Sequence, residues 1–174
     1  ATGDRWTLSA NAPRWREVVE PRAELAPILG LAESDLLDRP LWVNTGKEQL
    51  VVPVASAQAV RRARPRSDAF SRLRSEDGHS MAYVFADGGD ATGTVVSRFF
   101  FPSGSAVLED PATGSACANL GGWFCAVRPG QDIARTVLQG DEVGRPSTLS
   151  LAVVAGTVSV GGEVLELGHG TVRL

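Results

Sequence analysis

Short apolar runs, alternating or continuous, recur along the whole chain and predict β-strands. The first covers residues 4–13, which alternate like a strand inside a sheet and end at Asn11 and Pro13. Residues 38–56 contain two such runs on either side of Asn44–Lys47, and this arrangement predicts a hairpin.

Further strands are expected in the second half of the chain. Residues 79–88 and 94–104 each hold one, and the second is continuously apolar, which predicts a central place in the sheet. The tail has short β segments separated by glycines, at residues 135–141, 147–156 and 157–174, which predict an antiparallel meander. Many strands with few helices indicate an α+β fold rather than a regular β-α alternation.

Helical spacing appears first in residues 21–31, where apolar residues share one side and Gly30 ends the run. A polar segment at residues 56–78 is expected to hold two short helices divided at Pro65. The predicted helix at 115–127 is nearly free of charge.

That last helix has Gly121 and Gly122 in its middle. Such a pair destabilises a helix by roughly 1–2 kcal/mol relative to alanine. Close approach by the backbone of neighbouring elements is the expected compensation, so we predict a helix buried inside a curved sheet.

The composition is that of an ordinary globular protein, with 174 residues, 43% hydrophobic and 21% charged. This length suits one domain. The net charge of -3 gives no general electrostatic reason to bind nucleic acid or a membrane surface. No apolar run approaches the roughly 18 residues of a membrane helix, and no signal-peptide pattern opens the chain. Cys117 and Cys125 are two turns apart on the predicted helix, too far for a disulfide, so a reduced, cytoplasmic protein is expected.

The one basic cluster has six arginines between Arg61 and Arg74. Acidic residues are interleaved with them, and Phe70 is the one aromatic residue among them. Because single-stranded nucleic acids need a basic face with stacking groups, a solvated helix surface is the favoured interpretation.

The candidate chemistry lies in the string EDPATGSACANL. Proline lacks a backbone donor and disfavours helical geometry before it, so Asp110–Pro111 should lie in a polar loop that leads Gly114 and Ser115 into the first turn of the buried helix. A helix N-terminus presents unpaired N–H groups and about half a positive charge. The string therefore predicts a carboxylate pocket, with Asp110 on its rim to accept or move a proton. The alternative is that Thr113 or Ser115 merely caps the helix.

Two strings carry a family resemblance. EDPATGSA, with its flanks from RFFFPSG to GGWF, and QGDEVGRPS at 139–147 resemble the second half of the phenazine-biosynthesis PhzF-like isomerase family, and VNTGKEQLVVPV fits less specifically. The resemblance implies the diaminopimelate epimerase-like fold, with a mixed and antiparallel β half-barrel around a central buried helix. It also implies a catalytic and a substrate-binding set at a cleft between two halves. The catalytic set is Asp110 and Ser115, and the binding set is Thr113, Gly114, Ser115 and Ala116.

The resemblance also marks what this sequence lacks. Family members have a first half with a glutamate that shuttles the proton and a glycine–histidine segment that helps to hold substrate, and neither has a counterpart here. Glu109 belongs to the second-half motif and does not replace that base. We therefore expect residues 16–174 to form a C-terminal lobe, and residues 1–15 to supply a strand that completes, or is shared with, a missing N-terminal lobe.

The implied activity is proton relocation on a small carboxylate-bearing metabolite, without metal or cofactor. The resemblance also implies a role in secondary metabolism. The expected partners are this substrate and either a complementary N-terminal half or a second copy in a dimer, and not nucleic acid or a membrane. The alternative is a non-catalytic module that binds small molecules or proteins. His79 and His169 are expected to have structural or solvated roles.

Cys117 raises a further alternative, because related epimerases and racemases use paired cysteines as acid and base. A position near a helix N-terminus could lower the pKa of its thiol. Cys125 lies deeper in the same helix and offers no partner across a cleft. A packed small residue is the favoured interpretation of Cys117.

Overall fold

The computed structural model describes residues 4–89 and 93–172. In that part of the chain one sheet has the strand order β1-β10-β9-β8-β6-β5-β4-β3-β2, with β7 added beside β6. The strands are β1 (Arg5–Ser9), β2 (Arg14–Glu17), β3 (Leu41–Asn44), β4 (Glu48–Pro53), β5 (Ala82–Asp87), β6 (Thr94–Ser103), β7 (Ala106–Asp110), β8 (Ile133–Gln139), β9 (Ser147–Val154) and β10 (Thr157–Glu163).

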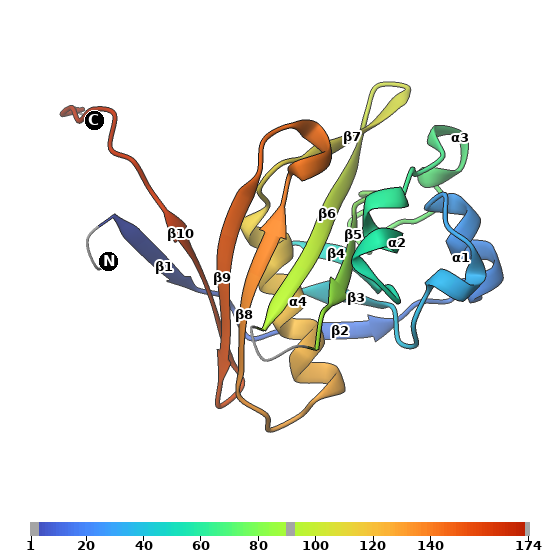
Figure 1. The fold of residues 1–174 in the computed structure, drawn as a ribbon, viewed down its shortest axis with the longest axis horizontal. Helices are drawn as coiled ribbons and strands as arrows, with labels where there is room; N and C mark the ends of the chain where they lie inside the picture. Colours follow the sequence, from blue (N-terminus) through green and yellow to red (C-terminus); the bar gives the residue numbers. More distant parts are fainter. Residues whose placement is uncertain (1–3, 90–92, 173–174) are drawn as a thin grey trace.

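The helices lie on both sides of this sheet. The sheet curves around α4, which is drawn behind β6 and β8 in Figure 1, whereas the other helices gather beside β4 and β5. The α-helices are α1 (Arg22–Ile28), α2 (Ala57–Arg62), α3 (Ser67–Phe70) and α4 (Gly114–Val127), with short 3₁₀ helices at Glu33–Asp35 and Asp141–Val143.

The strands from β3 to β6 are buried on both faces. One set of alternate residues packs under α1, α2 and α3, and the other set packs against α4, because successive side chains of a strand point to opposite faces. The first set includes Trp42, Leu50, Val84 and Phe100, and the second includes Val43, Val51, Tyr83 and Phe99. Two buried faces explain why these strands contain runs of consecutive apolar residues.

The strands from β8 to β10 form the predicted antiparallel meander. Their inward residues, such as Val137, Leu151 and Val158, pack against α4. The sheet is mixed, because β4 pairs in parallel with β5 and β6 pairs in parallel with β8. The predicted α+β half-barrel around a central helix is therefore confirmed.

The glycine pair of α4 allows close packing on two sides, but by side chains. A Cβ atom on Gly121 would lie 3.0 Å from Leu151 Cδ1 and still closer to Val158. A Cβ atom on Gly122 would lie 2.7 Å from Val43 Cγ1 and 2.9 Å from a carbon of the Pro13 ring. The expected close approach is present, and the expectation that backbone would make it was wrong.

The two ends of the sheet differ from the sequence prediction. β1 is the terminal strand and not an interior one, and it pairs with β10 through the register Arg5 opposite Glu163. β2, which the charged string RWRE did not suggest, pairs with β3 at the other end. A role for residues 1–15 in another lobe stays a prediction, and residues 1–3 lie outside the described part.

The remaining predicted elements are mostly in place. α2 and α3 lie on either side of Pro65, and all six arginines from Arg61 to Arg74 are exposed. Four of these arginines pair with carboxylates, as expected for a solvated surface. β10 ends at Glu163, so the β structure predicted up to residue 174 is too long, since residues 164–172 form no strand. None of the helices described here has both the length and the apolar character needed to cross a bilayer.

Candidate functional site

The EDPATGSA segment lies where β7 leads into α4. Glu109 and Asp110 are the last residues of β7, which pairs with β6, and residues 111–113 connect them to the helix. The polar loop expected here is therefore mostly a strand. The chain reverses at Gly104, whose φ of 59° suits glycine, and it returns along β6.

The first turn of α4 has free backbone donors. The Thr113 side chain makes no capping bond to the helix, and its hydroxyl instead donates to Asp110 Oδ2 at 2.5 Å. The first bond into the helix runs from the Cys117 N–H to the Thr113 carbonyl. Within the described residues, no acceptor meets the N–H groups of residues 114–116, and the Ser115 hydroxyl caps none of them. The capping alternative is therefore wrong, and three donors remain available to an anion.

One of the two carboxylate oxygens of Asp110 accepts a hydrogen bond within the protein. Its Oδ2 atom accepts the bond from Thr113, and its Oδ1 atom has no hydrogen-bond partner in the part of the chain that the structure describes. The residue is half-buried. A carboxylate in this state can still accept a hydrogen bond from a ligand.

The second motif string holds the first in place through Gln139. This buried side chain donates from Nε2 to the Asp110 carbonyl at 2.7 Å and to Thr113 Oγ1 at 3.0 Å. Gly140 follows with a φ of 88°, and a Cβ atom there would lie 2.7 Å from the carbonyl oxygen of Pro111. Gln139 and Gly140 thus shape the connection between β7 and α4, which begins directly after Asp110.

A cavity of about 290 Å³ opens beside this first turn. Gly114 faces open space, since a Cβ atom on it would meet nothing within 4 Å. Apart from Ser9 and Ser115, the lining is apolar or glycine. The lining residues are Leu8, Ser9, Ala10, Gly114, Ser115, Ala118 and Val160. Free donors at one end and an apolar wall suit a small anion that carries an apolar body.

A buried ion pair anchors the strand before the site. Arg98 donates to Glu109 Oε2 from Nε at 3.0 Å and from Nη2 at 2.6 Å, and both side chains are less than a tenth exposed. The same guanidinium donates to the carbonyls of Val60, Arg61 and Ala63 around the end of α2. Glu109 therefore anchors β7 by its ion pair with Arg98, and it is not among the residues that line the cavity beside α4.

Cys117 is fully buried, and burial raises the pKa of its thiol to about 12. Burial, the main cause, also raises the pKa of the half-buried Cys125. The possibility of a lowered thiol pKa at the helix N-terminus is therefore wrong, because loss of solvent outweighs the helix field. Both thiols are free, and Cys117 is a packed core residue.

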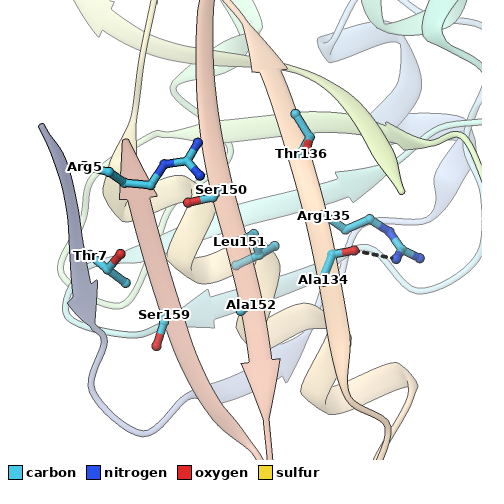
Figure 2. Close-up of a pocket in the computed structure, with 9 residues that line it drawn as sticks. All are labelled: Arg5, Thr7, Ala134, Arg135, Thr136, Ser150, Leu151, Ala152 and Ser159. Atoms are coloured by element: carbon cyan, nitrogen blue, oxygen red, sulfur yellow. Dashed lines mark hydrogen bonds between the residues drawn. The ribbon is translucent and has the colours of Figure 1, made fainter. Parts of the chain in front are cut away.

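A second hollow lies away from the motif. Figure 2 shows it on the face of β1, β10, β9 and β8 that is turned away from α4, with small polar side chains along its floor. None of the residues that line it belongs to either motif string. They are Arg5, Thr7, Ala134, Arg135, Thr136, Ser150, Leu151, Ala152 and Ser159.

Comparison with known families decides the relationship of this chain. A family model described as "Phenazine biosynthesis-like protein" matches residues 1–170. The chain belongs to the PhzC-PhzF family. Its match covers nearly the whole chain, so the PhzF-like resemblance carried by EDPATGSA and QGDEVGRPS is confirmed.

Curated relatives of this chain are named as isomerases. An uncharacterized isomerase of Pasteurella multocida is 35% identical over 144 residues, which is 82% of this chain and 47% of that protein. An uncharacterized isomerase of Mesorhizobium japonicum is 30% identical over 165 residues, which is 87% of this chain and 54% of that protein. The chain thus spans about half the length of the curated relatives it matches.

Solved structures of other proteins have the same fold. A PhzF-family phenazine biosynthesis protein of Bacillus anthracis superposes with a TM-score of 0.78 at 20% identity, over 91% of this chain and 57% of that chain. A predicted epimerase of Pseudomonas aeruginosa gives 0.68 at 25% identity, over 94% of this chain and 57% of that chain.

The fold brings most of the predicted site residues together. Asp110 and Thr113 are hydrogen-bonded, and Gly114 and Ser115 follow at the open turn and line the cavity. The Ala116 side chain is fully buried, so this residue can offer only its backbone N–H. Their roles in binding and catalysis stay predictions. His79 and His169 are exposed, beside Asp77 and Glu166 respectively.

Two polar residues of the site region were missed by the sequence analysis. Asn119 and Gln49 are buried and lead from the core to Ser115 Oγ, which accepts from Gln49 Nε2 at 3.2 Å. A signal was present, since Asn119 interrupts the apolar string CANLGGWF and Gln49 stands beside LVVPV. A buried amide in such a run needs partners, which makes it worth following.

Proposed function

We propose that this chain contributes half of an isomerase site that relocates a proton on a small carboxylate-bearing substrate. The observation that carries the proposal is the first turn of α4, where three N–H groups are unpaired and Gly114 and Ser115 line an open cavity. Oriented donors at the end of a 14-residue helix favour an anion. The isomerase names of the relatives support the reaction class.

Asp110 is the group that serves the reacting end of the substrate. Its free Oδ1 accepts a hydrogen bond from an amine or hydroxyl of the substrate, or takes part in the proton transfer, while Thr113 and Gln139 hold the residue in place. The main base removes a proton from one carbon, and the proton returns to another position, so that substrate and product are isomers.

We place the main base outside this chain, in a complementary N-terminal half or a second copy. The relatives extend well beyond the part that matches, and Glu109 is occupied by Arg98. The residues of this chain bind and orient the substrate and stabilise its charge, and the proposed chemistry uses no metal or cofactor.

The test is the Asp110→Asn variant in the complete assembly. A positioned acid–base group contributes about 10²–10⁴-fold, so turnover should fall about 100-fold while the fold is kept. The measurement is solvent-deuterium incorporation into candidate substrates by mass spectrometry. Ser115→Ala should mainly raise KM, because it removes a binding donor.

The matched control is Asp68→Asn, which makes the same chemical change on the exposed surface of α3. It should leave turnover unchanged. Full activity of Asp110→Asn would remove this residue from the mechanism. Carboxylate binding without any deuterium exchange in the complete assembly would favour the alternative of a non-catalytic binding module.

A further inference from the structure

We propose that Gln49 and Asn119 fix the direction of the Ser115 hydroxyl, so that the first turn of α4 presents donors only and selects an ionised carboxylate over the isosteric amide. The inference rests on the proposed anion site and identifies the residues that set its preference. Both act through Ser115 and are positioning residues.

Two backbone groups of the β3–β4 hairpin fix the orientation of the Asn119 side-chain amide. Asn119 Oδ1 accepts from the Thr45 N–H at 2.9 Å, and its Nδ2 donates to the Lys47 carbonyl at 2.8 Å. A backbone N–H can only donate and a carbonyl can only accept, so the Asn119 amide has a single orientation. The Thr45 hydroxyl donates to the same Oδ1 atom at 2.7 Å.

Gln49 connects the buried Asn119 amide to the exposed Ser115 hydroxyl, and its own orientation follows from that of Asn119. The Nδ2 group of Asn119 also donates to Gln49 Oε1 at 2.8 Å, which turns the Gln49 Nε2 group toward Ser115. Gln49 is 2% exposed and Asn119 is fully buried, so water does not compete for the bond between their two amides. Ser115 Oγ accepts from Gln49 at 3.2 Å.

The Ser115 hydroxyl proton is then directed away from Gln49. Ser115 is exposed and lines the cavity beside α4, and within the described residues its O–H group has no acceptor. At the cavity, the first turn of α4 therefore offers this O–H and the N–H groups of Gly114 and Ser115. A carboxylate only accepts, whereas the NH₂ group of an amide would face a donor.

The test measures the binding of benzoate and benzamide to the isotopically labelled chain. Both have a compact apolar ring of a size suited to the cavity, and binding is followed by NMR shifts of the Gly114 and Ser115 amides. Wild type should bind benzoate at least tenfold more tightly. The variants are Gln49→Met, Ser115→Ala and the double variant, each checked for a native spectrum.

We expect each single variant to lower the benzoate-to-benzamide affinity ratio about tenfold, as loss of a bond to a charged group does. The double variant should be no lower than either single one, since both remove the same oriented hydroxyl. A general structural defect would weaken both ligands and leave their ratio unchanged.

Three results would overturn the proposal. A wild-type chain without benzoate preference would reject it together with the anion site. A ratio changed by Ser115→Ala but not by Gln49→Met would reject the positioning role and leave the anion site standing. Multiplicative losses in the double variant would show that Gln49 acts independently of Ser115. If Gln49→Met does not fold, Gln49→Glu replaces it, and Ser115→Ala should then add no further loss.

Discussion

Gly114 and Gly121 stand in the same helix and have opposite surroundings. An added Cβ atom would meet nothing within 4 Å at Gly114, whereas at Gly121 it would collide with Val158 and lie 3.0 Å from Leu151. Both glycines look like weak points of a helix when only intrinsic preference is considered. At the first turn the absent side chain leaves room for a ligand, and in the middle it lets the sheet close around the helix.

This difference teaches that α4 combines a buried middle with an exposed first turn. The stretch from Ala116 to Phe124 is buried, and Gly114 and Ser115 before it are exposed. Packing of the middle of α4 fixes the position of the first turn, because a close-packed interior does not deform continuously. The donors at Gly114 and Ser115 are thereby held without any ligand.

The largest expected effect comes from Gly121→Val. The added branched side chain must displace Val158 and Leu151, and overpacking of this kind lowers the free energy of unfolding by about 3 kcal/mol. Urea denaturation followed by tryptophan fluorescence measures the change. A variant as stable as wild type would show that the sheet can retreat from the helix and would break the contrast with Gly114.

A smaller effect is expected at the other end of α4, where Asp87 pairs with Arg128 and Arg135. Burial alone would raise the pKa of Asp87, but the hydrogen bond and charge of Arg135 and the charge of Arg128 outweigh burial and lower it below 3.8. This stabilisation is present above the unfolded pKa and is lost as the pH falls through the lowered folded value.

Asp87→Asn should therefore destabilise the protein by about 1 kcal/mol near neutral pH, within the range measured for partly exposed ion pairs. The difference from wild type should shrink as the pH falls below 3.8 and vanish under stronger acid. Denaturation curves across this pH range provide the measurement. A difference that is independent of pH would mean that packing, and not charge, holds this end of α4.

The smallest expected effect on stability is that of Gly114→Ala. Its methyl group enters open space, so the free energy of unfolding should change by no more than about 0.5 kcal/mol. Benzoate affinity should nevertheless fall, because the methyl group occupies the approach to the free N–H groups. Denaturation and NMR titration of the same sample separate the two effects, and unchanged benzoate affinity would place the ligand elsewhere.

The sequence predicted the elements whose patterns have a local cause. The consecutive apolar residues of β6 follow from burial on both faces, and the apolar α4 with its glycine pair follows from enclosure. The string EDPATGSA also indicated the open helix N-terminus correctly. In each case the residues themselves carry the signal.

What could not be predicted depends on distant partners. The short strand β2 forms only by pairing with β3, and its sequence RWRE has no hydrophobic alternation that would predict a strand. The roles of Gln49 and Gln139 arise only when strands far along the chain meet the first turn of α4. The high pKa of Cys117 comes from burial by the surrounding sheet, which local position in a helix does not indicate.

The enclosure of α4 has a consequence for the order in which the molecule folds. Asn119 bonds to Thr45, 74 residues away, Trp123 Nε1 donates to the Arg39 carbonyl, 84 residues away, and Val158 packs on the opposite side. A helix with two central glycines gains little from its own sequence, and distant contacts form slowly because long loops must close first. We therefore expect α4 to become helical late in folding, only when the hairpin before it and the meander after it have assembled around it.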